Sequence, residues 1–105
     1  MVVFSRGVGS HRVGHGLRLV AAMLGMDRPT TVVFVDGGTE LLRAGAVEDP
    51  VELDYLTALS DLAGLHALRE SLEGRVDLNP ELDVTLVGVD ELAEMMGECG
   101  AVVAF

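Results

Sequence analysis

The chain has no lysine, no tryptophan and a single cysteine among its 105 residues. Without lysine, Schiff-base chemistry and a complete phosphate-binding P-loop are both excluded, because each needs that amine. One cysteine, Cys99, cannot form a disulfide within the chain, which suits the reducing cytoplasm. No apolar run approaches the roughly 20 residues that span a bilayer, and the apolar start Met1–Ser5 is too short for a signal peptide. We therefore expect a cytoplasmic protein without a membrane segment.

Basic residues are scarce as well, since seven arginines stand against 17 acidic side chains and the formal net charge is −10. This excess of negative charge repels phosphate backbones, so direct binding to nucleic acid is not expected. Half of the residues are hydrophobic, which is too many for a disordered chain and enough for one domain over residues 1–105. In so small a domain some apolar surface stays exposed, and this favours assembly into an oligomer.

Short β-rich runs alternate with helical patterns along the chain. Strands are predicted at 1–5, 31–36, 84–87 and 101–105, where β-branched and aromatic residues cluster. The segment 65–73 has helical spacing in its leucines, yet it follows a helix stop and has room for a short strand first. The alternation predicts an α/β fold: a flavodoxin-like three-layer α/β/α sandwich with a mostly parallel sheet of about five strands.

The expected helices have recognisable ends. The first follows a glycine-rich turn at 6–16 and stops at Gly25, and Thr39 can cap a short helix over 40–44. Asp49 is the expected N-cap of the next helix, with Pro50 at its first position. Asp90 can cap a last helix over 91–99. One apolar face is predicted for the helix after Asp49, formed by Val51, Tyr55, Ala58, Leu59 and Leu62.

The glycine-rich turn is the first candidate site. It follows the first strand, and ligands of open α/β sheets gather at the carboxyl ends of strands. Its glycines resemble half a P-loop, but a histidine and a glycine stand where lysine and Ser/Thr are required. Two interpretations stay open: a turn that merely needs glycine flexibility, or a pocket for a small molecule or anion. The residues of such a pocket are Gly7, Gly9, Ser10, His11 and His15, together with Gly37 and Gly38 after the second expected strand.

Metal and cysteine chemistry have weaker support. His11 and His15 have the spacing of a zinc-binding helix, but Arg12 replaces the catalytic glutamate, so we expect no metal. Cys99 lies at the expected end of a helix, where the dipole and neighbouring glutamates disfavour a thiolate. A small buried hydrophobic side chain is the favoured interpretation of Cys99, and a nucleophile is the alternative. The acidic residues 90, 91, 94 and 98 share one helical face and are expected to be solvated.

Four segments together resemble the DsrE/DsrF-like sulfur-relay family, which includes the small subunits of the Dsr and Tus complexes. They are the first strand with its turn and helix, VVFVDGGTELLRAG at 32–45, LHALRESLEG at 65–74, and VTLVGVDELAEMMGECGAVVAF at 84–105. The resemblance implies a flavodoxin-like sandwich that associates through apolar faces with copies of itself or with related small subunits. It also implies that 65–68 is the third strand and that a helix begins at Arg69.

In sulfur-carrying members of that family the reactive cysteine follows the third strand. Leu68 and Arg69 occupy that position here, so the resemblance implies a non-catalytic scaffold or regulatory subunit, with no cofactor and no enzyme activity of its own. Two alternatives stay open: a persulfide carrier that uses Cys99, whose activity would be sulfurtransferase-like, and a module that binds a small molecule at the glycine turns.

Overall fold

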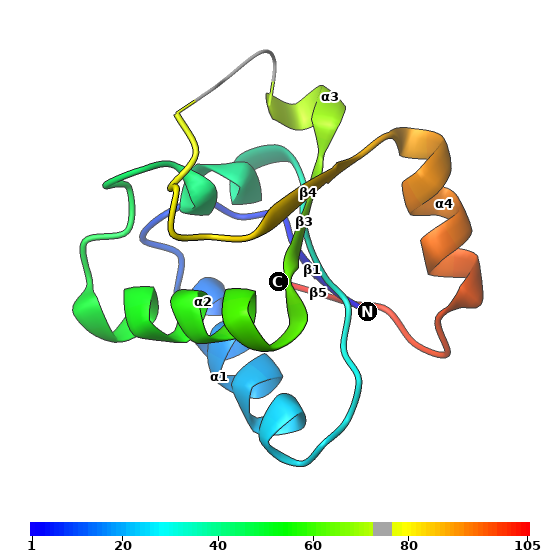
Figure 1. Ribbon diagram of the computed structural model, residues 1–105, viewed down its shortest axis with the longest axis horizontal. Coiled ribbons are helices and arrows are strands. Elements are labelled where there is room, and N and C mark those ends of the chain that lie inside the picture. Colours follow the sequence, from blue (N-terminus) through cyan, green and yellow to red (C-terminus); the bar gives the residue numbers. More distant parts are fainter. Residues whose placement is uncertain (73–76) are drawn as a thin grey trace.

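Five short parallel strands form one sheet in the computed structural model, which describes residues 1–72 and 77–105 (Figure 1). Across the sheet the strands run in the order β4–β3–β2–β1–β5. The strands are β1 (Val2–Phe4), β2 (Val32–Phe34), β3 (Leu65–Leu68), β4 (Val84–Val87) and β5 (Val103–Ala104). The helices are α1 (His11–Gly25), α2 (Pro50–Ala63), α3 (Arg69–Leu72) and α4 (Val89–Glu98), with a 3-10 helix, η1, at Asp36–Leu42. The predicted fold class is confirmed, and 65–68 is a strand.

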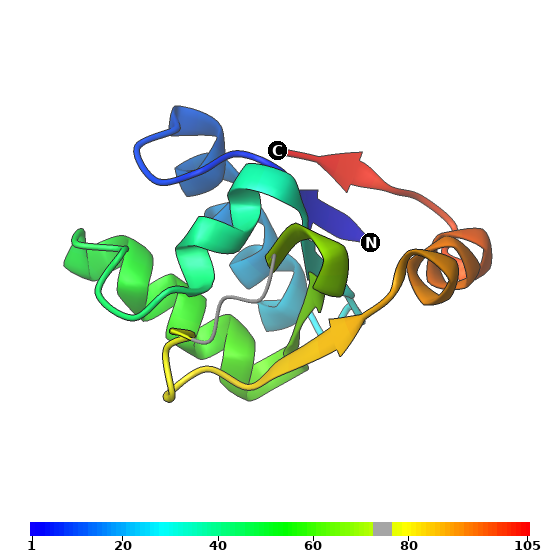
Figure 2. The ribbon, with the colours of Figure 1, turned by 90° about the horizontal axis from the view of Figure 1, so that it is seen from above.

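The strand order explains where the helices lie. From β1 to β4 the chain adds each new strand beside the previous one, and right-handed crossovers in one direction place α1 and α2 on the same face. The chain then returns from β4 at one edge to β5 at the other, so α4 crosses the opposite face. Figure 2 shows α4 on the far side of the sheet from α1 and α2. The result is three layers, with the sheet in the middle.

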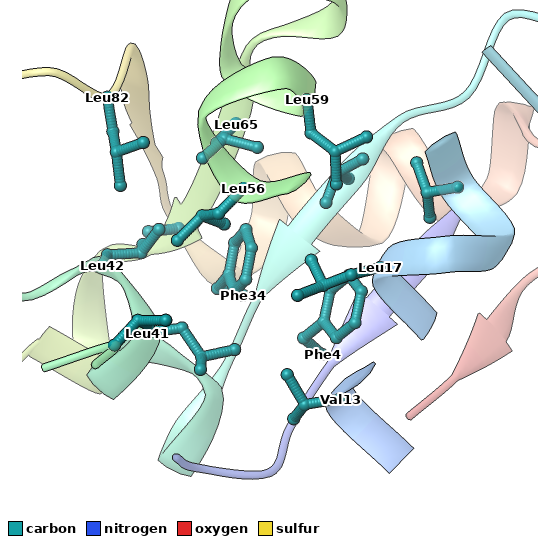
Figure 3. Packing of buried hydrophobic residues seen from close by; sticks show 14 of the residues in the cluster. Phe4, Val13, Leu17, Phe34, Leu41, Leu42, Leu56, Leu59, Leu65 and Leu82 are labelled. Carbon is teal, nitrogen blue, oxygen red and sulfur yellow. The ribbon is translucent and has the colours of Figure 1, made fainter. Parts of the chain in front are cut away.

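The larger core fills the space between the sheet and the α1–α2 layer. Phe4 and Phe34, neighbours in register on β1 and β2, stack with ring centroids 5.2 Å apart (Figure 3). Phe105 stacks on Phe4 at a centroid distance of 5.9 Å. Leu17 of α1 and Leu56 of α2 pack against the same cluster. The opposite face has a smaller core, in which Val33, Val87 and Leu92 are buried. All three residues of β2 are thus buried, as predicted for a central strand covered on both faces.

The first helix begins earlier than the glycine-rich sequence predicts. α1 starts at His11, so Gly14 and Gly16 are helical and the expected turn over 6–16 is shorter. Packing explains the glycine inside the helix, because a Cβ on Gly16 would lie 2.6 Å from Cε1 of Phe4 and 2.8 Å from Cγ of Phe105. The close approach of α1 to the aromatic cluster therefore outweighs the poor helix propensity of glycine.

Two predicted caps are wrong. Helix η1 starts directly after β2, so Thr39 lies inside it, where its hydroxyl donates a 2.8 Å hydrogen bond to the carbonyl of Asp36. Gly88, and not Asp90, is the N-cap of α4, and Asp90 lies in the first turn. The predicted cap of α2 is confirmed: the Asp49 carboxylate accepts from the amides of Val51 at 2.9 Å and Glu52 at 3.4 Å.

The predicted apolar face of α2 is only partly buried, and Tyr55 of that face packs against the larger core. Leu59 is buried, together with Leu56 and Ser60, but Val51 is 56% exposed and Leu62 is 68% exposed. Ser60 faces the same side as Leu56 and Leu59, where its hydroxyl accepts a part-buried 2.6 Å hydrogen bond from the amide of Asp83. Apolar residues surround much of α2, and the sheet can cover only one side of it.

Candidate functional site

The two glycine turns lie side by side at the carboxyl edge of the sheet. β1 and β2 are adjacent parallel strands, with Phe4 opposite Phe34, so the turns that follow them meet. A Cβ on Gly37 would be 3.2 Å from the carbonyl oxygen of Ser5 and 3.5 Å from the amide of Gly7. A Cβ on Gly38 would collide with the carbonyl oxygen of Phe4. The structure therefore brings the predicted turns together, and their glycines permit that close approach.

A cavity of about 460 Å³ opens beside these turns, at the carboxyl ends of β2 and β3. One wall comes from η1 and the other from the β3–α3 junction. The amide of Asp36 donates a 2.9 Å hydrogen bond to the Ser71 hydroxyl and so links the two walls. Asp36 has a φ of +48°, which turns the chain sharply from β2 into η1. The lining residues are Asp36, Gly37, Thr39, Glu40, Leu68, Glu70 and Ser71.

The charge of this cavity opposes the binding of an anion. Three carboxylates, those of Asp36, Glu40 and Glu70, line it, and no basic side chain is among the described lining residues. Asp36 and Glu70 are exposed and Glu40 is half-buried. Such a lining suits a cationic or hydroxyl-rich molecule, because carboxylates accept hydrogen bonds and attract positive charge.

Among the residues predicted for a ligand site, Gly37 lines the cavity. Gly7 lies close to the lining residue Glu40, since a Cβ on Gly7 would be 2.6 Å from Oε2 of Glu40. The predicted residues Gly9 and Ser10 are not among the lining residues, and His11 and His15 are exposed, one turn apart on α1. In the part of the chain that the structure describes, no three His, Cys, Asp or Glu residues come together as a metal site.

Sequence reasoning missed the polar lining of the cavity. Asp36 comes two residues after the end of β2, and Glu70 and Ser71 come just after β3. The signal was their position after two strands that the fold places next to each other. Glu40 and Thr39 became part of the site because η1 begins earlier than expected.

Cys99 lies at the amino edge of the sheet, at the opposite ends of the strands from the cavity. It follows α4 as its C-cap and is half-buried, so the expectation of a buried side chain is wrong. The segment after it runs beside the start of β1, where the N-terminal ammonium of Met1 donates to the carbonyl of Ala101 at 2.8 Å. The start of β1 marks the amino edge of the parallel sheet, and the cavity is at the carboxyl edge. The thiol and the cavity are therefore separated by the length of the strands.

Comparison with solved structures identifies a close match in fold. The YchN protein from E. coli superposes with a TM-score of 0.75 at 19% sequence identity, over 99% of this chain and 97% of that one. The likeness establishes the fold. No protein-family model matches the sequence, and no curated protein is similar to it in sequence. Among the described residues, no helix combines the length and apolar character needed to cross a bilayer.

Proposed function

We propose that this protein is a non-catalytic subunit of a sulfur-relay type oligomer. The fold shared with YchN supports the resemblance of the sequence to DsrE/DsrF-like proteins at the level of architecture. The observation that carries the non-catalytic role is the junction of β3 and α3, where carriers of that family hold their cysteine. Here Leu68 ends the strand, Arg69 begins α3, and the cavity beside them is lined without a thiol.

The position of Cys99 supports the same proposal. A sulfur carrier needs its thiolate stabilised by positive surroundings, such as a helix N-terminus or an arginine. Cys99 instead caps the C-terminal end of α4, where the helix dipole is negative, and Glu98 precedes it. The cavity at the opposite edge therefore has no part in chemistry at this thiol.

Intact-mass spectrometry tests the proposal after incubation of the protein with a cysteine desulfurase and cysteine. We expect no added sulfur on the wild type. The matched variant Cys99→Ser has no thiol and sets the background. An added sulfur atom on the wild type that is missing from Cys99→Ser would make the protein a carrier through Cys99 and overturn the non-catalytic role.

The acidic cavity supports a second candidate, a small-molecule binding module. Its volume of about 460 Å³ lies within the range of small-ligand pockets. Its three carboxylates favour cationic ligands, such as polyamines or amino sugars, over the anion that the sequence offered as one possible ligand. A thermal-shift screen that includes both classes tests this candidate, with Glu70→Gln as the variant that removes one charge. Stabilisation by a cationic ligand, reduced in Glu70→Gln, supports it, and the absence of any stabilising ligand counts against it.

A further inference from the structure

The outer side of α2 carries an apolar stripe that the fold leaves largely uncovered, although its Tyr55 is half-buried against the larger core. Val51, Tyr55, Ala58 and Leu62 recur at intervals of four, three and four residues, which places them along one face of a helix. Val51 and Leu62 are more than half exposed, at 56% and 68%. A shallow hollow of about 370 Å³ lies on this stripe. The charged side chains beside the stripe include Asp54 and Asp61, both exposed, and α2 contains no basic residue.

Helix α1 lies next to α2 on the same face of the sheet (Figure 1). It carries a second uncovered stripe. Leu19 and Ala22 share one face of α1 with Met26, the C-cap that follows the helix, and Leu19 is 41% and Met26 63% exposed. The charges of this helix are of the opposite sign, because Arg12 and Arg18 are exposed and α1 contains no acidic residue. The α1–α2 layer thus presents a basic apolar helix beside an acidic apolar helix.

Within the described part of the chain, the exposed arginines of α1 and the exposed aspartates of α2 form no ion pair. The salt bridge found there joins Arg43 and Asp77. The two helices do contact each other near their N-terminal ends, since a Cβ on Gly14 would be 3.3 Å from Oε1 of Glu52. That contact leaves the outward stripes and their flanking charges free for another surface.

We propose that the α1–α2 layer is the interface through which two copies of this chain associate about a two-fold axis. In a two-fold dimer every contact occurs twice, so an interface that sets α1 of one copy on α2 of the other also sets α2 of the first on α1 of the second. This arrangement buries both apolar stripes at once and sets Arg12 and Arg18 against the acidic helix of the second copy. The inference rests on the oligomer proposed above and names the surface that forms it.

The face of α4 is a poorer choice for contact between copies. Its exposed Val89 and Met96 also form an apolar strip, but the charges of α4 are all acidic. Two copies joined there would bring the carboxylates of residues 90, 91, 94 and 98 together, and like charges across an interface oppose association. Charge complementarity therefore selects the α1–α2 layer.

Charge exchange tests the interface by sedimentation velocity at micromolar concentrations. The first variant, Arg12→Glu with Arg18→Glu, makes both helices acidic, and the second, Asp54→Arg with Asp61→Arg, makes both basic. We expect each to associate at least about tenfold more weakly than the wild type, because two attractions become two repulsions in each half of the interface. An equimolar mixture should regain the dimer, since every acidic helix then faces a basic one.

A matched control reverses two charges outside the interface, Glu94→Arg with Glu98→Arg on α4, and should associate as the wild type does. Circular dichroism establishes that all variants fold. A wild type that associates while both charge variants associate equally well overturns this interface but leaves the proposed oligomer standing. Failure of the mixture to form a dimer also overturns the interface. A wild type that stays monomeric overturns both the interface and self-association as the form of the oligomer.

Discussion

The contact between α1 and the aromatic cluster gives a prediction whose sign depends on packing. Gly16→Ala adds one methyl group inside a helix, and helix propensity alone would make it stabilising by about 1 kcal/mol. That methyl would lie 2.6 Å from Cε1 of Phe4 and 2.8 Å from Cγ of Phe105. Phe4 is fully buried and stacked on Phe34, so its ring has little room to move. Overpacking of this kind costs about 1–3 kcal/mol, and we expect it to exceed the gain in propensity.

Gly25→Ala provides the matched control in the same helix. Nothing lies within 4 Å of a Cβ at that position, so no clash offsets the gain in helix propensity. We expect Gly25→Ala to leave stability unchanged or to raise it slightly, and Gly16→Ala to lower the free energy of unfolding by up to about 2 kcal/mol net. For a domain of this size that loss corresponds to a decrease in Tm of up to about 16 °C.

Urea unfolding followed by circular dichroism measures both variants. The reasoning is refuted if Gly16→Ala is as stable as Gly25→Ala with the same dependence on urea. A double-mutant cycle with Phe105→Ala separates the two rings. If Phe105 causes part of the strain, Gly16→Ala should cost less in the Phe105→Ala background, because neighbouring substitutions that share a contact are not additive.

Three further predictions concern capping, a part-buried hydrogen bond and the thiol. Asp49→Ala should lower the free energy of unfolding by about 0.5–2 kcal/mol, because two amides of the first turn of α2 lose their acceptor. The control Asp54→Ala, on the same helix, should change the free energy of unfolding little. Urea unfolding measures both variants. Ser60→Ala should cost about 1–3 kcal/mol in the same assay, since the amide of Asp83 loses its partner in a part-buried position; an unchanged stability would mean that water replaces it. Cys99→Ser should retain the melting temperature of the wild type by circular dichroism, because this thiol is half-buried and outside both cores.

Local sequence determined most of the secondary structure. The run at 32–34 is β-branched and aromatic, and it forms a strand buried on both faces. Asp49 followed by Pro50 begins α2 where the capping pattern predicts. These signals act over a few residues, through side-chain shape and hydrogen bonds to nearby amides, so they can be interpreted before the fold is known. For 65–68, periodicity alone left helix and strand open, and the family resemblance favoured the strand.

The tertiary structure decided which side of each element is buried and which residues share a site. In the sequence Val51 and Leu62 are equivalent to Leu59, but packing against the sheet buries Leu59 and leaves Val51 and Leu62 more than half exposed. The cavity combines residues near 36–40 with residues near 68–71 because β2 and β3 are neighbours in the sheet. Helical periodicity records that a face is apolar but not what covers it. Burial and the composition of a site arise from contacts between segments distant in the chain, and only the assembled fold specifies those contacts.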